Sequence, residues 1–269
     1  MKRLERSDAT LHYLREGSGP PLILVQGAGV IGEGWRPQID ALRDTHAIAA
    51  LDNRGIGRSS FRSRTLTIDD MAADVMAVAD AEGFARFHLA GHSIGGLVAQ
   101  AVALRASARV ISLALLCTFT RGREASRLAP DIVWIGLRTR LGTRAMRRRA
   151  FMQLTLPDAY LRTADQPRLA AELATLFGRD LADQPPIVMQ QLRAAARFDV
   201  STRLRELADV KTLVMSARHD RIAPPRFGRA LAAAIPGARY VEIDAAGHAA
   251  PIQCAGEVNE VLAEHLQDR

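Results

Sequence analysis

The sequence predicts an α/β protein in which a parallel sheet carries helices on both faces. Short, continuous apolar runs, which are typical of strands buried on both sides, alternate with stretches whose apolar residues recur at helical spacing. This alternation fills the first part of the chain, stops near residue 118 and resumes near residue 208. For a chain of 269 residues, we expect one domain with a sizeable core that carries an insertion.

The first part of the chain alternates between expected strands and expected helices. The strands are expected at residues 22–25, 47–51, 87–90 and 110–117, and helices at 35–42 and 97–104. A further helix is expected to begin at Thr67, because Asp69 and Asp70 in its first turn suit the helix dipole. Its apolar residues recur at helical spacing: Ile68, Met71, Val75 and Val78.

The middle of the chain is expected to be helical, with helices at residues 131–141, 143–153, 167–177 and 186–197. Strands at 212–215 and 239–243 and helices at 226–234 and 257–266 then restore the alternation. We therefore predict a core domain formed by residues 1–117 and 208–269, with residues 118–207 as a helical cap over the active site. Ligands of such sheets bind at the carboxyl ends of the strands.

The composition argues against several classes of protein. The net charge is +7, but there is neither zinc-finger spacing nor an RNA-binding aromatic motif, so we expect a solvated basic surface and no nucleic-acid partner. No apolar run approaches the length of a membrane span and residues 1–6 begin no signal core, so we expect no membrane partner and a cytoplasmic location. Cys117 and Cys254 predict neither a disulfide framework nor a metal site.

The most informative segment is Gly91-His92-Ser93-Ile94-Gly95-Gly96, which joins an expected strand to an expected helix. The G-x-S-x-G pattern has catalytic meaning in this strand–turn–helix context. The turn is so tight that Gly91 and Gly95 must lack side-chain bulk. Ser93 would then stand at the apex of the turn, with its hydroxyl free for a base and a substrate.

A serine nucleophile needs a base within hydrogen-bond reach, and the base needs a carboxylate that fixes its tautomer. Asp220 lies in the loop after one late strand, and His248 lies in a glycine turn after the next. Asp244 is a rival carboxylate at the end of a strand, where we expect a structural role. We also expect His92 and His219, which neighbour these residues, to be structural.

The chain order serine, aspartate, histidine resembles that of α/β-hydrolases. The same resemblance is carried by a Q-G-x-G loop, a D-x-R-G-x-G-x-S loop, the G-H-S-x-G-G turn, an aspartate loop that ends in proline, and a G-H pair near the end. In combination, these motifs resemble an α/β-hydrolase with a helical cap, similar to the enol-lactonase and carboxylesterase branches. The resemblance covers nearly the whole chain outside the cap. It implies that Ser93 is the nucleophile, Asp220 the acid and His248 the base.

Acyl transfer also needs preorganised N–H donors for the oxyanion. One donor is expected from the backbone of Ile94, directly after the nucleophile and at a helix N-terminus. By resemblance, Ala28 is the second donor, and Gln26, Gly27 and Gly29 support its loop. Relatives usually begin this loop with histidine; Gln26 departs from that pattern but can still form a hydrogen bond that braces the loop.

The sequence therefore predicts a serine hydrolase that cleaves a carboxylic ester or lactone, without a metal or organic cofactor. The same triad also serves C–C bond hydrolases, thioesterases and perhydrolases, and the fold alone does not choose among them. A non-catalytic relative that binds a small ligand is an alternative of another class. The expected partner is a small-molecule ester or lactone, and the protein is expected to be a monomer or homodimer.

Two features of the expected cap stay open at this stage. Its aromatic residues Trp134, Phe151 and Phe177 could line the pocket or form the core of the cap. Its arginines could bind an anionic substrate or form a solvated face; the densest run is Arg138, Arg140, Arg144, Arg147, Arg148 and Arg149.

Overall fold

The computed structural model describes residues 1–63, 65–126 and 130–267, and its described strands form one nine-stranded sheet in the order β1-β2-β4-β3-β6-β7-β8-β9, with β5 beside β2. The strands are β1 Lys2–Glu5, β2 Ala9–Glu16, β3 Pro21–Val25, β4 Ala47–Asp52, β5 Ser60–Phe61, β6 Phe87–His92, β7 Val110–Leu116, β8 Lys211–Ala217 and β9 Arg239–Ile243. Neighbouring strands are parallel along the part of the sheet ordered β4-β3-β6-β7-β8-β9. Strand β2 is antiparallel to its neighbours β1, β4 and β5. This mostly parallel sheet confirms the predicted fold class.

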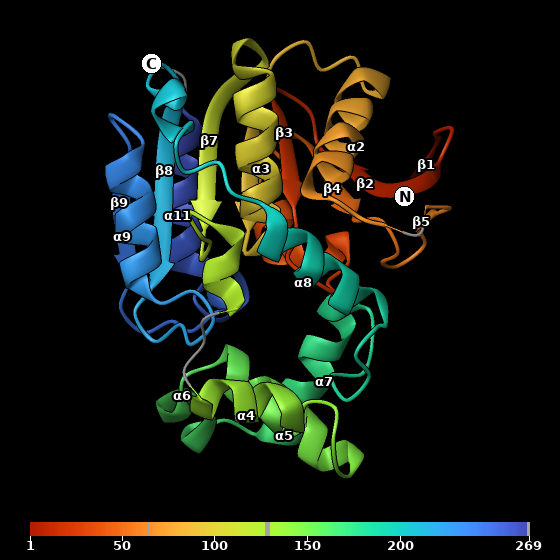
Figure 1. Ribbon diagram of the computed structural model, residues 1–269, viewed down its shortest axis with the longest axis vertical. Helices are drawn as coiled ribbons and strands as arrows, with labels where there is room; N and C mark the ends of the chain where they lie inside the picture. Colours follow the sequence, from red (N-terminus) through yellow and green to blue (C-terminus); the bar gives the residue numbers. More distant parts are fainter. Residues whose placement is uncertain (64, 127–129, 268–269) are drawn as a thin grey trace.

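Helices cover both faces of the sheet (Figure 1). They are α1 Arg36–Leu42, α2 Ile68–Ala81, α3 Ile94–Arg105, α9 Pro225–Ala234, α10 Ala250–Gln253 and α11 Ala255–Leu266. Successive strand residues point to opposite faces, so Leu22 and Leu24 join one core with α1 and α11, while Ile23 and Val25 join the other with α2 and α3. Burial on both sides explains why these strands are continuous apolar runs in the sequence.

Among the described residues, five α-helices lie between β7 and β8 in the chain, and Figure 1 shows α4 to α7 beyond one end of the sheet. They are α4 Pro130–Arg138, α5 Arg144–Thr155, α6 Asp158–Thr163, α7 Gln166–Phe177 and α8 Ile187–Arg197. Their small apolar core includes Phe151, Leu173 and Phe177, and it also takes in Val30 and Ala249 from loops of the sheet domain. Of the predicted cap, residues 127–129 lie outside the described residues.

Short 3-10 helices complete the described elements: η1 Gly32–Trp35, η2 Ser107–Arg109, η3 Gly122–Ser126 and η4 Leu204–Leu207. The helix expected at residues 131–141 ends earlier, at Arg138. Apart from the 3-10 helices, five described elements were not expected from the sequence: β1, β2, β5, α6 and α10. Strand β1 is mostly exposed and charged, so its extended form depends on the backbone pairing with β2 rather than on an apolar pattern.

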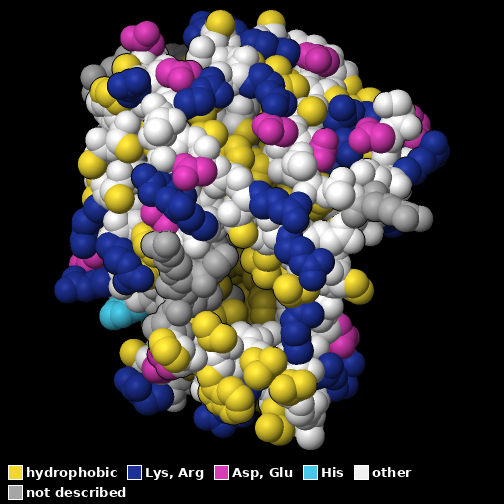
Figure 2. Space-filling model, in the orientation of Figure 1, with side chains coloured by type: hydrophobic (Ala, Val, Ile, Leu, Met, Phe, Trp, Pro, Cys, Tyr) yellow, Lys and Arg dark blue, Asp and Glu magenta, His cyan; other side chains and the backbone are white. Residues whose placement is uncertain are grey.

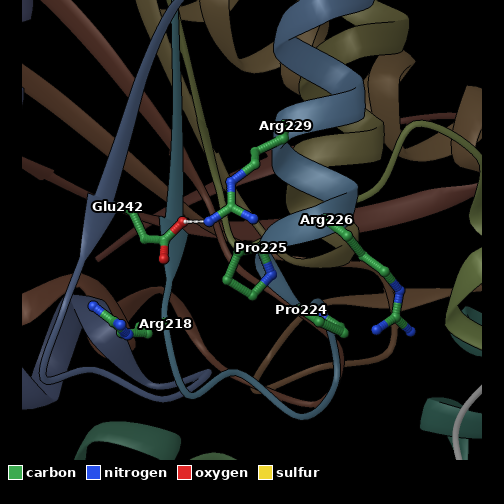
Figure 3. Close-up of a pocket in the computed structure, with 6 residues that line it drawn as sticks. All are labelled: Arg218, Pro224, Pro225, Arg226, Arg229 and Glu242. Atoms are coloured by element: carbon green, nitrogen blue, oxygen red, sulfur yellow. Dashed lines mark hydrogen bonds and ion pairs between the residues drawn. The ribbon is translucent and has the colours of Figure 1, made fainter.

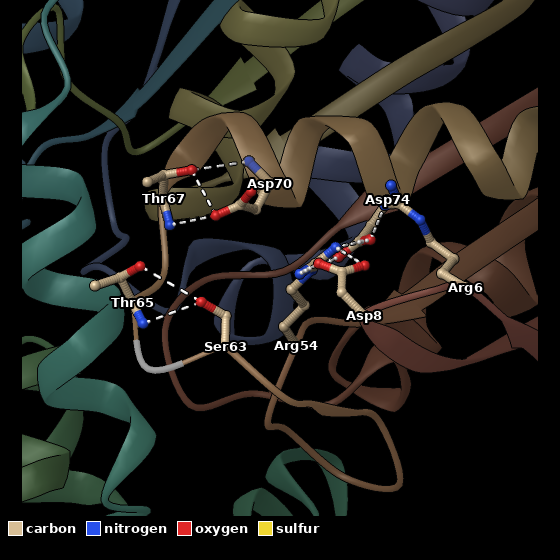
Figure 4. A network of polar contacts seen from close by, with 8 residues as sticks. All are labelled: Arg6, Asp8, Arg54, Ser63, Thr65, Thr67, Asp70 and Asp74. Atoms are coloured by element: carbon tan, nitrogen blue, oxygen red, sulfur yellow. Dashed lines mark hydrogen bonds and ion pairs between the residues drawn. The ribbon is translucent and has the colours of Figure 1, made fainter.

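A buried ionic network ties the loop after β4 to α2 and to the N-terminal hairpin (Figure 4). Arg54, 2% exposed, donates from Nη1 to Asp8 at 2.6 Å and from Nη2 to Asp74 at 2.8 Å. Arg6 also binds Asp74. Nearby, Thr67 caps α2 by accepting from the backbone of Asp70, as expected for a helix that begins there.

Replacing Arg54 with methionine is expected to lower the free energy of unfolding by about 3–5 kcal/mol, because it leaves the buried Asp74 carboxylate with too little compensating charge. Urea denaturation measures this loss. The matched control is Arg105→Met, since Arg105 forms a more exposed pair with Asp69 at 2.8 Å, and its loss should cost about 1 kcal/mol or less. Equal losses in the two variants would contradict the structural role of Arg54.

Candidate active site

Ser93 occupies a strained turn between β6 and α3, with φ 55° and ψ −122°. This conformation is uncommon for a residue with a side chain. The flanking glycines are required by space: a Cβ on Gly91 would lie 2.2 Å from the carbonyl oxygen of Gly95, and a Cβ on Gly95 would lie 2.1 Å from that of Val25. The tight strand–turn–helix that the G-x-S-x-G pattern predicts is therefore present.

Hydrogen bonds hold the backbone of Ser93 on both sides. Its N–H donates to the carbonyl oxygen of Leu116, at the end of the adjacent β7, at 2.9 Å. Its own carbonyl oxygen accepts from the Thr118 hydroxyl at 2.6 Å and from the Gly96 N–H at 2.9 Å. Thr118 was not expected from the sequence, because a threonine after a strand gives no sign of which distant carbonyl it will bind.

The structure brings Ser93, His248 and Asp220 into one hydrogen-bonded chain. His248 Nε2 lies 3.0 Å from Ser93 Oγ, and His248 Nδ1 lies 2.7 Å from Asp220 Oδ2. All three residues are buried. Because Nδ1 faces a carboxylate, it carries the proton in the neutral ring and leaves Nε2 as a base toward the serine hydroxyl.

The environment of Asp220 favours its ionised form. Its side chain is fully buried, which alone would raise the pKa, but the charge and hydrogen bond of His248 and two backbone hydrogen bonds outweigh burial and hold the pKa of Asp220 below its ordinary value. The backbone donors are the N–H groups of Ile222 and Ala223, each 2.8 Å from Oδ1. In contrast, Asp244 is exposed and pairs with Arg218 at 3.0 Å.

The loop after β3 lies directly beside Ser93, since a Cβ on Gly27 would come within 3.1 Å of the Ser93 Cβ. Gln26 Oε1 accepts from the Gly27 N–H at 2.8 Å, and Asn53 donates to the Gln26 carbonyl oxygen at 2.8 Å. Glutamine therefore braces this loop from within. Asn53 was not expected from the sequence, since the loop that contains it gave no sign of this contact.

The two expected oxyanion donors, Ala28 and Ile94, lie in suitable backbone settings. Ile94 is the first residue of α3, so its N–H has no acceptor within the helix. The Ala28 N–H forms no hydrogen bond to any residue in the described ranges. Both groups are thus free to bind an oxygen that enters the site.

His92 is buried against the site but lies outside the Ser93–His248–Asp220 chain. Its Nε2 lies 2.8 Å from the His248 carbonyl oxygen and must donate to it. Burial, together with the nearby His248 ring, lowers the pKa of His92 from 6.5 to about 3. A neutral ring then has no proton on Nδ1, so its 3.2 Å approach to Gln26 Oε1 is a contact between two acceptors. The Trp35 indole meets the ring edge-on at 6.3 Å. His219, in contrast, is exposed.

The inserted helices also reach the loop after β3. Gln191, from α8, accepts from the Gly29 N–H at 3.0 Å, and Arg179, just after α7, donates from Nε to the Gly29 carbonyl oxygen at 3.2 Å. Neither residue was expected to contact the site. Polar residues on an amphipathic helix carry no signal that separates solvent exposure from a distant backbone partner.

Figure 2 shows a hollow between the sheet domain and the inserted helices, with hydrophobic side chains inside it. Phe151 and Phe177 pack edge-on at 5.4 Å within the core of the insertion, whereas Trp134 is 59% exposed. Among the arginines of the dense run, Arg144 and Arg148 pair with Asp180. These ion pairs favour a structural role for Arg144 and Arg148.

A separate depression lies at the edge of the sheet, between α9 and β9 (Figure 3). Its volume is about 460 Å³, and Arg229 pairs with Glu242 in it at 2.6 Å. Ser93, His248 and Asp220 do not line it, so it does not belong to the candidate active site.

Comparison with known proteins agrees with this fold. The family model described as alpha/beta hydrolase fold matches residues 20–253. A relative from Azorhizobium caulinodans is 30% identical over 95% of this chain and 94% of its own length, and one from Variovorax paradoxus is 31% identical over 95% and 96%. Both carry the provisional name carbamate hydrolase RutD.

Solved structures match over nearly the whole chain. The enol-lactonase from Burkholderia xenovorans has 27% identity and a TM-score of 0.82, covering 99% of this chain and 100% of its own. A hydrolase from Pseudomonas aeruginosa has 26% identity and a TM-score of 0.80, covering 99% and 98%. The chain belongs to the α/β-hydrolase fold family, and its relatives support hydrolase activity. Within the described residues, no helix has the length and apolar character needed to span a bilayer.

His92 is expected to stay neutral in the folded protein down to pH 5. The unfolded chain takes up a proton there near pH 6.5, whereas folded His92 does so near pH 3, so this residue lowers the stability as the pH falls between these values. A pH titration of the histidine ring nitrogens by NMR measures this directly. A His92 midpoint near 6.5 would contradict the buried, neutral assignment.

Proposed function

We propose that the protein is a serine hydrolase that cleaves a carboxylic ester or lactone through an acyl-enzyme on Ser93. The observation that carries the proposal is the continuous hydrogen-bonded chain from Asp220 through His248 to Ser93 Oγ, with distances of 2.7 and 3.0 Å. The strained turn that presents the serine, and the N–H groups of Ala28 and Ile94, which have no hydrogen-bond acceptor among the described residues, would supply the other parts that acyl transfer needs.

In the first half of the reaction, His248 Nε2 takes the Ser93 proton as Oγ attacks the substrate carbonyl carbon. The negative charge that forms on the carbonyl oxygen is stabilised by the N–H groups of Ala28 and Ile94. Asp220 stabilises the imidazolium and keeps Nδ1 protonated. The tetrahedral intermediate collapses, His248 gives its proton to the leaving oxygen, and the ester bond breaks.

In the second half, a water molecule takes the place of the leaving group. His248 removes a proton from it while the water oxygen attacks the acyl carbon, and the same N–H donors stabilise the second oxyanion. Collapse breaks the bond to Ser93 Oγ and returns the proton from His248 to the serine. The product is a carboxylic acid; from a lactone, the acid and the alcohol remain on one molecule.

A carbamate is a second candidate substrate, because relatives at 30% and 31% identity are named for carbamate hydrolysis. We favour an ester or lactone, because the enol-lactonase match extends over 99% of this chain with a TM-score of 0.82. Rates with an ester, a lactone and a carbamate of matched size decide between them, and turnover of the carbamate alone would reject our preference.

We further propose that residues 118–207 act as a cap over this site, on the core formed by residues 1–117 and 208–269. The hollow between the two parts would then hold the acyl or alcohol portion of the substrate. The expected cytoplasmic location, and a monomeric or homodimeric state, stay predictions.

A fluorophosphonate probe is expected to add once to the protein, because an activated serine hydroxyl displaces fluoride and forms a stable phosphonate ester. Intact-mass measurement detects the adduct, and Ser93→Ala should abolish it. The untreated variant should keep the melting temperature of the parent. Labelling that persists in Ser93→Ala would reject Ser93 as the nucleophile.

Asp220→Asn should reduce kcat by about 10³–10⁴-fold, since the amide can donate to Nδ1 and favour the wrong tautomer of His248. Steady-state kinetics with an ester substrate measures this loss. Asp244→Asn is the matched control, because Asp244 is exposed and pairs with Arg218 on the surface, and its activity should stay near that of the parent. A large loss in the control would reverse the choice between the two carboxylates.

A further inference from the structure

The backbone around Ala28 has few constraints of its own. Gly27 and Gly29 flank Ala28 in the sequence, and glycine permits backbone rotations that other residues resist. Gly29 adopts φ 72°, a conformation that favours glycine. The direction of the Ala28 N–H therefore depends on hydrogen bonds that other parts of the chain make to this loop.

Those hydrogen bonds come from two sides. Gln26 Oε1 holds the Gly27 N–H at 2.8 Å, within the loop. On the other side, Gln191 Oε1 holds the Gly29 N–H at 3.0 Å and Arg179 Nε holds the Gly29 carbonyl oxygen at 3.2 Å. Both polar groups of Gly29 are thus bound by side chains of the inserted region, and the Ala28 N–H lies between two fixed peptide groups.

Arg179 is itself held firmly in place. Its guanidinium lies over the rings of Phe151 and Phe177, 5.4 and 6.0 Å from their centroids, and its Nη1 donates to the Asp183 carbonyl oxygen at 2.7 Å. Burial lowers the pKa of Arg179 to about 10, which leaves it charged at neutral pH. Arg179 is therefore a partly buried cation whose side chain is fixed by the two rings and by its hydrogen bonds.

Gln191 is also seated in a packed environment. It is fully buried, on the face of α8 that also buries Val188 and Ala195. Its Oε1 is used by Gly29, whereas its Nε2 has no hydrogen-bond partner among the described residues. The bond from the Gly29 N–H is therefore the interaction in the described structure that satisfies the oxygen of this buried amide.

We propose that Gln191 and Arg179 are positioning residues, through which the inserted helices fix the oxyanion-binding loop. By holding both polar groups of Gly29, they aim the Ala28 N–H at the oxygen on which charge develops. This inference rests on the proposed function. It implies that full activity requires the inserted helices to be seated against the loop, so that the position of the insertion controls the chemical step as well as access.

The test compares Gln191→Met, which removes the acceptor, with Gln191→Glu, which keeps an acceptor of the same shape whether or not it is protonated. With p-nitrophenyl acetate as the probe substrate, Gln191→Met should lower kcat about tenfold or more and leave KM within about twofold, because the oxyanion interaction forms in the transition state. Gln191→Glu should recover most of kcat. Gln190→Met is the matched control on the same helix and should resemble the parent.

Hydrogen–deuterium exchange supplies a readout that does not depend on activity. Gln191→Met should raise the exchange of a peptide that covers residues 26–31, while the parent, Gln191→Glu and Gln190→Met stay alike. Unchanged exchange and kcat in Gln191→Met would overturn the inference. So would a Gln191→Glu variant as impaired as Gln191→Met, since the acceptor would then not be what matters.

The experiments can reject the proposed hydrolase function without rejecting the inference that the inserted helices fix the loop. If the parent neither turns over esters nor reacts with the fluorophosphonate probe, the hydrolase proposal is lost. Raised exchange in Gln191→Met would still support the fixing of the loop by the insertion, and unchanged exchange would overturn that as well.

Discussion

The candidate site depends on one residue held in an unfavourable backbone conformation. A φ of 55° at Ser93 costs about 1–3 kcal/mol, and it persists because the surroundings leave no alternative. Strand β6 lies in the interior of the sheet between β3 and β7, and the Ser93 N–H is bound to the end of β7. Glycines at positions 91 and 95 then allow α3 to leave the strand at once. Sheet geometry therefore places Ser93 in a turn at the carboxyl edge of the sheet.

The parallel sheet also determines where the other groups come from. Because the carboxyl ends of parallel strands share one edge, residues far apart in the chain meet there without long loops. Asp220 follows β8 and His248 follows β9, which are adjacent, while the loop with Ala28 follows β3, beside β6. The surroundings also set the protonation state of two buried groups at this edge. Hydrogen-bond donors hold Asp220 ionised, and burial holds His92 neutral.

The parts of this arrangement that sequence could predict are those set by local pattern. Continuous apolar runs predicted the parallel strands, and the spacing of glycines predicted the turn at Ser93. Position within the loops after late strands favoured Asp220 over Asp244, and the structure brings Asp220, not Asp244, to His248. Strand β1 was missed, because its pairing with β2 depends on a partner and not on its own residues.

Long-range contacts of polar side chains were also beyond prediction. Thr118 binds the Ser93 carbonyl oxygen, and Gln191 binds the Gly29 N–H from 162 positions away in the chain. A buried glutamine and an exposed one look the same in an amphipathic helix, because the helical pattern tolerates both. The position of α8 against the sheet domain, which decides between them, is a property of the packed molecule.

The sheet domain and the inserted helices each contain one of the two tryptophans, so intrinsic fluorescence can report on each part. Trp35 is fully buried with its ring against His92, whereas Trp134 stands on α4 and is 59% exposed. Their intrinsic fluorescence should therefore separate into a component shielded from aqueous quenchers, which reports on the surroundings of His92, and an accessible one, which reports on the inserted helices. Movement of one part against the other can be followed in solution without attaching a dye.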